Sequence, residues 1–186
     1  MDHGWMLHGL QIYEEAVHVP LVFRWPAKLP AGTTIAQPVE LADLMPTVLE
    51  LTGSALPQLK HPPEGVSLAA ALTGKGTLDP QRAVLTQRRF YASDSERGVA
   101  VKGSKHGLRV GNWKYLEAKE EDSFELYDLA SDPKEQHNLA KDKPEQRDAL
   151  AKQLRTTLSG TSVAAPAPHG VSPEDARRLE ALGYVQ

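Results

Sequence analysis

Cysteine is absent from this chain, and its absence excludes three kinds of chemistry at once. Without a thiol the chain can form no disulfide bond, no thiolate metal site and no cysteine nucleophile. The same absence does not select a compartment, because cysteine-free proteins occur in reducing and in oxidising surroundings. The redox setting of the protein therefore stays open.

Long apolar runs and an excess of charge of one sign are also missing. No apolar stretch approaches the roughly 20 residues that a membrane-spanning helix needs. The first residues include Asp2 and His3 where a signal peptide would carry a basic stretch and an apolar core, so no targeting signal is expected. The net charge is -3, from 21 basic and 24 acidic residues. Such a balance favours neither nucleic acid nor a membrane surface as a partner.

The residues that are present suffice for a folded chain: there are 186 of them, and 40% are hydrophobic. The most informative short motif is Asp2-His3-Gly4. A carboxylate supplies the hard oxygen that Ca²⁺ or Mg²⁺ prefers, and a neighbouring imidazole can ligate a metal or donate to a bound anion. Alone, this tripeptide is more often a turn than a metal site, so its interpretation depends on the rest of the chain.

An apolar stretch within residues 14–26 centres on Leu21–Phe23. Its near-continuous β-branched and aromatic character is typical of a strand covered on both faces in an α/β sheet. After a loop rich in Pro and Gly, Asp43 is placed to cap a helix that Gly53 would end. The apolar stripe of this helix, formed by Leu44, Val48 and Leu51, indicates packing against the strand.

The middle of the chain interrupts this pattern. Residues 54–66 hold three prolines and a glycine, which predicts a surface loop and a subdomain boundary. Ser67 can then cap a short helix over Leu68–Leu72 that Gly74 closes.

Beyond residue 82, short runs that mix apolar and polar residues predict a small antiparallel sheet. Gly111-Asn112 is a two-residue turn of the kind that joins antiparallel strands. A helix should begin at Pro144 and end at Gly160, because leucines recur on one of its faces. The expected strands are Ala83–Leu85, Gly98–Lys102, Leu108–Val110, Trp113–Glu117 and Phe124–Tyr127, and a terminal helix should end near Leu182.

These patterns predict an α/β fold whose C-terminal part is α+β. Residues 1–53 would form the edge of a mixed sheet, and residues 54–81 a connection with a short helix. Residues 82–160 would form a small antiparallel sheet flanked by helices, and residues 161–186 a linker and the terminal helix. A strand left at the edge of an incomplete sheet is prone to pair with other chains, so self-association is expected.

Several strings of the chain, in order, resemble the C-terminal part of the sulfatase family, in the alkaline phosphatase superfamily. The resemblance covers nearly the whole chain, and the order of the strings makes it more specific than any one of them. The strings are DHGWMLHGL, YEEAVHVPLVFRWP, ELADLMPTVLELTG, GLRVGNWKYL, ELYDLASDPKEQHNLA and LEALGYV.

The resemblance implies hydrolysis of a sulfate ester of a small molecule or glycan, at a site with a divalent cation, usually Ca²⁺, and a formylglycine nucleophile. Carried over by position, Asp2 and His3 match the metal turn. His8 matches a histidine that touches the sulfate or protonates the leaving oxygen. Family members commonly have a longer segment between the metal turn and YEEA, often with two His-Gly pairs, so which pair His8 represents stays open. A periplasmic or secreted location is also consistent with the family.

The chain departs from the family in one respect: its formylglycine motif, Cys or Ser followed at two-residue intervals by Pro and Arg, does not occur. The paired aspartates that complete the metal site are not matched either. The chain therefore resembles a C-terminal fragment, a truncated reading frame or one piece of a split protein. Alone it is expected to be inactive and to bind Ca²⁺ poorly, because two ligands rarely hold a cation that takes six to eight oxygens.

Two other functions remain open, namely a phosphate or phosphonate ester hydrolase of the same superfamily and a non-catalytic binding module. Among the remaining polar residues, His106 is a second candidate for contact with an anionic substrate, because basic residues flank it, although a solvated hairpin tip is the alternative. Glu14 and Glu15 are expected to be solvated or capping residues. Lys114 is expected to be an exposed lysine of the sheet.

Overall fold

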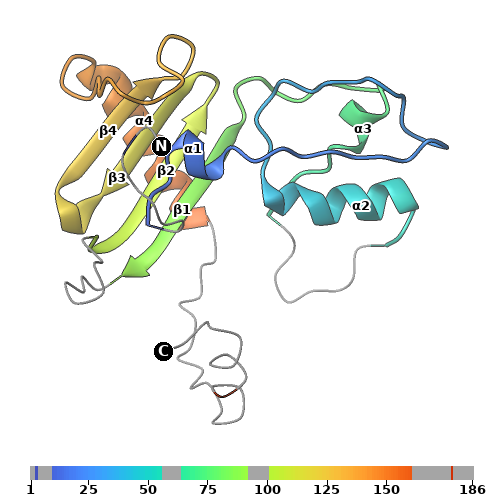
Figure 1. Cartoon of the computed structure of the whole chain (residues 1–186), viewed down its shortest axis with the longest axis horizontal. Helices are drawn as coiled ribbons and strands as arrows, with labels where there is room; N and C mark the ends of the chain where they lie inside the picture. The colour runs from blue at the N-terminus through green and yellow to red at the C-terminus, as the bar shows by residue number, and fades with distance from the viewer. Residues whose placement is uncertain (1–2, 4–9, 56–63, 92–100, 161–176, 178–186) are drawn as a thin grey trace.

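The computed structural model describes residues 3, 10–55, 64–91, 101–160 and 177. Figure 1 shows a sheet with a long helix at one end of the molecule and two shorter helices at the other, joined by extended segments. The helices are α1 (Glu14–Val17), α2 (Leu44–Thr52), α3 (Ala69–Leu72) and α4 (Pro144–Gly160), and 3₁₀ turns span Leu41–Asp43 and Lys119–Glu121. The strands are β1 (Ala83–Tyr91), β2 (Gly103–Val110), β3 (Trp113–Ala118) and β4 (Ser123–Asp128).

The two ends of the molecule are the sheet region and the helical region. The sheet region comprises residues 10–17, 83–91 and 101–160. The helical region comprises residues 18–55 and 64–82.

The four strands form one antiparallel sheet, as expected from the sequence, and their order is β1-β2-β3-β4. Gly111 has a φ of 57°, and with Asn112 it forms the turn between β2 and β3, where Val110 pairs with Trp113. A left-handed φ at this position costs a glycine little, so the two-residue turn predicted from Gly-Asn is confirmed.

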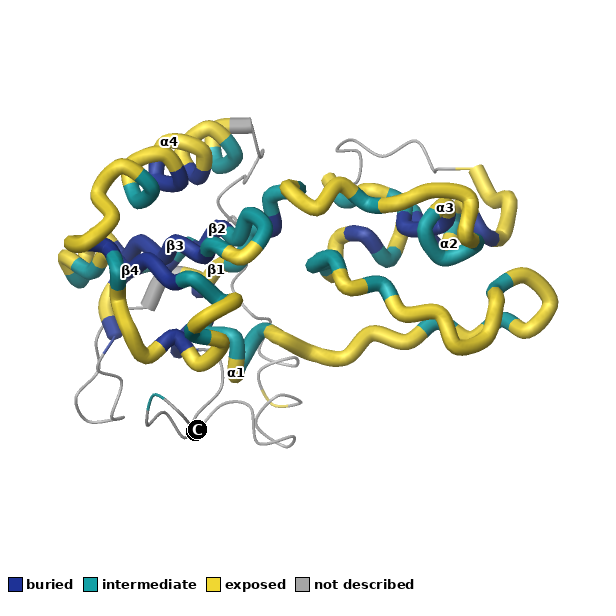
Figure 2. Tube along the Cα trace, turned by 90° about the horizontal axis from the view of Figure 1, so that it is seen from above, coloured by how far each residue is buried: buried dark blue, intermediate teal, exposed yellow. Residues whose placement is uncertain are grey.

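Side chains alternate between the two faces of the sheet along each strand. Both faces are covered by other parts of the chain. One face packs on α4 through a core that includes Leu108, Tyr115, Leu126, Leu150 and Leu154. The other face packs on the segment around α1 through Ile12, Leu116 and Tyr127. Figure 2 shows the buried strands between α4 and α1. Full burial of each leucine contributes about 1.5–3 kcal/mol.

The predicted α4 is confirmed with its bounds and its apolar face. It begins at Pro144 and ends at Gly160, and Leu150 and Leu154 are buried. Leu158, one turn further on, is partly buried against the same core. The fourfold leucine spacing therefore sets the packing of this helix against the sheet.

The predicted helix before Gly53 is also confirmed, as α2, and Gly53 ends it with a φ of 71°. Asp43 stands at the position before the helix, but its side chain makes no capping bond to α2. The carboxylate instead accepts the backbone N–H groups of Glu40 and Val66, each at 2.9 Å, and lies 3.0 Å from Arg82 Nη1. Asp43 therefore joins three segments of the helical region. The expected short helix is confirmed as α3; Ser67 Oγ accepts the N–H of Ala69 at 3.2 Å, although Leu68 and not Ser67 stands at the N-cap position.

The prediction of a strand around Leu21–Phe23 is wrong. Glu14–Val17 is helical, and residues 18–25 form no strand. Val19 and Val22 are 56% and 84% exposed. The apolar pattern is that of a strand covered on both faces, but no strand lies within the described part of residues 1–53 to pair with it.

Other expectations concern the ends of the described segments and the helices within them. The strand expected at Gly98–Lys102 is not seen at its two described residues, since β2 begins only at Gly103. Residues 98–100 and nearly all of the expected terminal helix lie outside the described residues. None of the helices in the described ranges has the length and hydropathy needed to cross a membrane.

Candidate functional site

Of the residues assigned to a site from sequence, the structure describes His3 and His106. Asp2 and His8 lie outside the described residues. Of the expected metal turn, the structure therefore describes the surroundings of His3.

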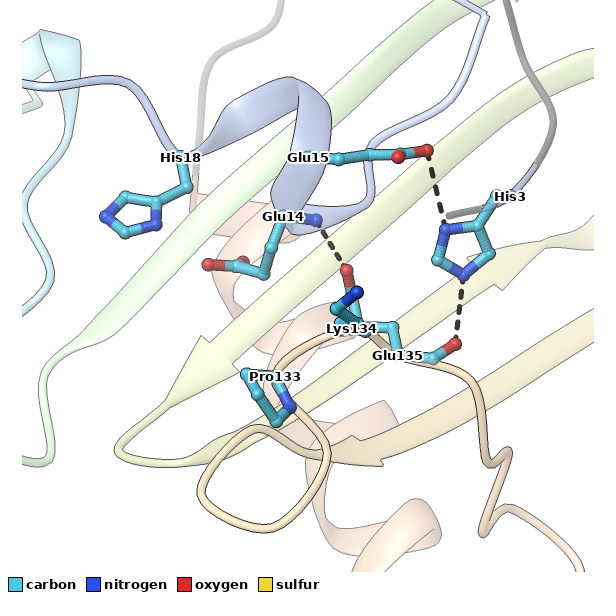
Figure 3. A pocket seen from close by; sticks show the side chains of 7 residues that line it. All are labelled: His3, Glu14, Glu15, His18, Pro133, Lys134 and Glu135. Atoms are coloured by element: carbon cyan, nitrogen blue, oxygen red, sulfur yellow. Dashed lines mark hydrogen bonds and ion pairs between the residues drawn. The ribbon is translucent and has the colours of Figure 1, made fainter. Parts of the chain in front are cut away.

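The ring of His3 is held on three sides. It stacks on the Tyr13 ring, with 3.7 Å between centroids and 6° between planes. Its Nε2 lies 3.0 Å from the backbone carbonyl oxygen of Glu135, and its Nδ1 lies 3.5 Å from Glu15 Oε1. Figure 3 shows His3 between Glu15 and Glu135. The contacts thus come from the segment around α1 and from the loop after β4.

These contacts assign the proton on the His3 ring. A backbone carbonyl only accepts hydrogen bonds, so the His3 Nε2 that faces Glu135 must carry the hydrogen. In the neutral ring, Nδ1 then holds a lone pair; it is buried, makes no hydrogen bond among the described residues and lies 3.5 Å from the Glu15 carboxylate. A histidine that binds a metal through one nitrogen typically donates its other N–H to a carbonyl or carboxylate. His3 has this arrangement.

Glu135, which contacts His3, belongs to a group of four charged residues, two buried and two partly buried, here called the buried charge cluster: Glu14, Arg109, Lys114 and Glu135. Lys114 Nζ lies 2.9 Å from both Glu14 Oε1 and Glu135 Oε1. Arg109 Nη1 lies 3.1 Å from Glu14 Oε2. The side chains of Lys114 and Glu135 are each 1% exposed. Two cations and two carboxylates balance, which is the condition under which charges persist in a protein interior.

A second polar group adjoins the cluster around Glu125. Its carboxylate accepts hydrogen bonds from the hydroxyl groups of Tyr13 at 2.8 Å and Tyr127 at 2.7 Å. It also lies 2.6 Å from Lys105 Nζ. Burial alone would raise the pKa of Glu125, but the Lys105 ammonium and the two hydroxyls outweigh it and lower the pKa. Burial and the neighbouring Glu125 raise the pKa of Tyr13. Tyr13 is therefore neutral, and its hydrogen bond to Glu125 holds the ring on which His3 stacks.

A cavity of about 280 Å³ opens beside His3. It is lined by His3, the Glu14-Glu15 pair, His18 and residues 133–135 (Figure 3). The lining is mostly charged or polar, so the cavity suits a hydrophilic ligand better than an apolar one.

The structure does not bring His106 to this place. His106 lies on β2 beside Lys105, which points toward Glu125 and Tyr13. Neighbouring residues of a strand face opposite sides, so His106 faces the α4 side of the sheet. Burial there lowers its pKa, although Glu117 and Glu120 act in the opposite direction. His106 is therefore neither in the His3 site nor at a hairpin tip.

Sequence reasoning missed the charged residues that support the site. Lys114 was expected to be exposed and is buried, and Glu14 was expected to be solvated or capping but pairs with Lys114 and Arg109. A usable signal was present, because Lys114 alternates with Trp113 and Tyr115, which places it on the opposite face of β3. If both faces are covered, a lysine there needs a buried carboxylate partner.

The residues described can be tested against the divalent cation that the family resemblance implies. His3 fits the cation as a single ligand, because its Nδ1 makes no hydrogen bond among the described residues and the Glu15 carboxylate, 3.5 Å away, favours positive charge beside it. Within the described ranges, however, no three His, Cys, Asp or Glu side chains gather closely enough to hold a metal ion. The expected ligand Asp2 lies outside those ranges.

Known proteins similar to this chain include several sulfatases. A mouse (Mus musculus) arylsulfatase K is 31% identical over 172 residues, covering 88% of this chain and 30% of the relative. A Bacteroides thetaiotaomicron Delta 4,5-hexuronate-2-O-sulfatase is 32% identical over 146 residues, covering 76% of this chain and 28% of the relative. The chain thus spans less than a third of the length of these relatives.

Solved structures show the same fold. One, in complex with its substrate D-glucosamine-2-N,6-O-disulfate, superposes with a TM-score of 0.60 at 24% identity, covering 73% of this chain and 27% of that one. The phosphonate monoester hydrolase of Silicibacter pomeroyi superposes with a TM-score of 0.65 at 23% identity, covering 83% and 31%. These likenesses confirm the expected α/β class, with its antiparallel sheet flanked by helices.

The family model that matches is described as N-sulphoglucosamine sulphohydrolase, C-terminal, and it covers residues 1–164. Because that match covers most of the chain, the chain belongs to the sulfatase family and corresponds to its C-terminal portion.

Proposed function

We propose that this chain is the part of a sulfatase that supplies and supports one turn of the active site, in an enzyme that hydrolyses sulfate esters of a small molecule or glycan. One observation carries the proposal. His3 has Nε2 bonded to the Glu135 carbonyl, while its buried Nδ1 makes no hydrogen bond among the described residues and lies 3.5 Å from the Glu15 carboxylate. A packed sheet thus presents a histidine ready to receive a cation.

The roles of the other site residues follow from the family resemblance. Asp2 and His3 would hold a divalent cation, Ca²⁺ in this family, which would stabilise charge developing on the sulfuryl oxygens. His8 would contact the sulfate or protonate the leaving oxygen. The formylglycine nucleophile, whose motif the chain does not contain, would come from another part of the enzyme.

The chemical class of the substrate is supported by the relatives. Their names include a hexuronate 2-O-sulfatase and an N-acetylglucosamine-6-O-sulfatase, both from Bacteroides thetaiotaomicron. The cavity beside His3 has the polar lining that a sugar requires. A sulfated saccharide is therefore the substrate class that we propose for the complete enzyme.

The test is ester hydrolysis by the polypeptide translated from the genomic reading frame that contains this chain. We expect turnover of an aryl sulfate, faster than that of the matching aryl phosphate or phosphonate, and none by the 186-residue chain alone. Faster turnover of the phosphate or phosphonate would instead favour the related hydrolases of the superfamily. No turnover of any ester by the translated protein would favour a non-catalytic module.

A further inference from the structure

Glu135 is the residue through which the buried charge cluster reaches the turn that carries His3. Its φ is 54°, in the left-handed region that residues other than glycine rarely adopt. The preceding turn is fixed by Asp132, which accepts the backbone N–H groups of Gln136 at 3.1 Å and His137 at 2.8 Å. An unfavourable backbone conformation persists only where its surroundings over-determine it.

Glu135 makes contacts in three directions. Its backbone carbonyl accepts the hydrogen bond from His3 Nε2, and its Oε2 accepts the backbone N–H of Glu14 at 2.5 Å. Its Oε1 pairs with the buried Lys114 of β3. One side chain therefore ties the loop after β4 to both α1 and the sheet, and this fixes the direction of its own carbonyl.

Stacking cannot by itself orient the His3 ring. Stacking on Tyr13 fixes the plane of the imidazole. It does not prevent the ring from turning over within that plane by half a turn, which would exchange the positions of the nitrogen atoms with those of carbon atoms. The hydrogen bond to the Glu135 carbonyl distinguishes the two orientations, because only a protonated nitrogen can face that oxygen.

We infer that Glu135, held by Lys114, is a positioning residue for His3: it fixes the proton on Nε2 and so turns the Nδ1 lone pair to the side of Glu15. The purpose of that lone pair rests on the proposed function, but the positioning itself does not. Its failure can therefore be recognised without any measurement of activity.

The test is nuclear magnetic resonance of the imidazole nitrogens in the ¹⁵N-labelled 186-residue chain, at a pH of about 8, above the ordinary imidazole pKa. We expect His3 to show protonated Nε2 and unprotonated Nδ1, with an Nε2 proton that exchanges slowly with water. In Lys114→Met and in Glu135→Gln that proton should exchange at least tenfold faster, and the two nitrogen shifts should move toward each other.

Two controls separate positioning from unfolding. His106 lies on the opposite face of the same sheet, so its unchanged signals report that a variant is folded. Asp43→Asn alters another buried carboxylate, one of the helical region, and should leave the His3 signals as they are.

A wild-type His3 that carries its proton on Nδ1, or that exchanges its Nε2 proton rapidly, would overturn the inference without any variant. So would an unchanged His3 in either variant whose His106 signals remain native.

Discussion

The sheet region and the helical region both bury charged pairs, but they differ in how far their apolar side chains are covered. The sheet region buries charged residues in balanced groups, around Lys114 and around Glu125, and both of its faces are covered. The helical region exposes large apolar side chains along its connecting segment and on α2, namely Val19, Leu21, Val22, Leu41, Met45 and Val48. Figure 2 shows this contrast as buried strands at one end and a mostly exposed segment at the other.

The difference separates a region that covers its own core from a region that leaves large apolar side chains exposed. A region that pairs its buried charges and covers its faces meets the requirements of a stable core. Several large apolar side chains left exposed in one region are instead typical of a surface that packs against something else. Since the chain spans less than a third of the length of its relatives, the helical region is where we expect the rest of a sulfatase to pack.

The largest effect is expected in the sheet region. Lys114→Met leaves Glu135 buried without its cation and Glu14 with Arg109 alone, and breaking a buried pair in this way costs about 3–5 kcal/mol. Urea unfolding followed by tryptophan fluorescence measures the loss. The matched control is Lys119→Met, at a lysine of which 67% is exposed and whose partner is Glu117. It should cost about 0–1 kcal/mol. Equal effects of the two variants would contradict a special role for burial.

A smaller and more local effect is expected in the helical region. Asp43→Asn removes the charge that pairs with Arg82 and weakens the bonds to the N–H groups of Glu40 and Val66. We expect a loss of about 1.5–3 kcal/mol, the range for hydrogen bonds to a charged group. Hydrogen exchange should show faster opening of α2 and α3, with protection of β2 and β3 unchanged. Equal loss of protection in the strands would show that the two regions unfold as one unit.

The pH dependence of stability should also differ between variants of the sheet region. The pKa of Glu125 is lowered in the folded protein, so its unfolded form binds more protons at mildly acidic pH. The stabilisation is present above the ordinary glutamate pKa of 4.5 and is lost as the pH falls through the lower folded value. Glu125→Gln should flatten this part of the profile of unfolding free energy against pH. An unchanged slope in that variant would assign the acid sensitivity to other carboxyl groups.

Local patterns predicted much of the sheet region. Gly111-Asn112 specified its turn, and the spacing of Leu150 and Leu154 specified the buried face of α4. These features depend on neighbours in sequence or on a single helical face. The pairing of Lys114 with Glu135, or of Tyr13 with Glu125, joins residues far apart in the chain, and no local pattern encodes which carboxylate meets which cation.

The strand expected at Leu21–Phe23 failed for a related reason. Its apolar sequence is suited to a strand, but a strand also needs a neighbour to bond its backbone. Among the described residues no backbone hydrogen bond reaches residues 21–24. The same argument explains why the metal site could not be built from the Asp-His-Gly turn alone, since its remaining ligands would have to come from elsewhere.

The smallest effect on stability, but a clear one on association, is expected at the exposed segment. Val22 is 84% exposed, so Val22→Lys should change the free energy of unfolding by no more than about 0.5 kcal/mol. An apolar extended segment with unbonded backbone groups is prone to pair with a second copy, and a lysine opposes such pairing by charge and hydration. Light scattering at increasing concentration should therefore show self-association of the native chain and less of it in the variant. Val84→Ala, which changes a buried valine of β1, is the control: it should lower stability and leave association unchanged. A native chain that stays monomeric at high concentration would mean that the helical region needs no partner, and the contrast between the two regions would then be one of surface composition alone.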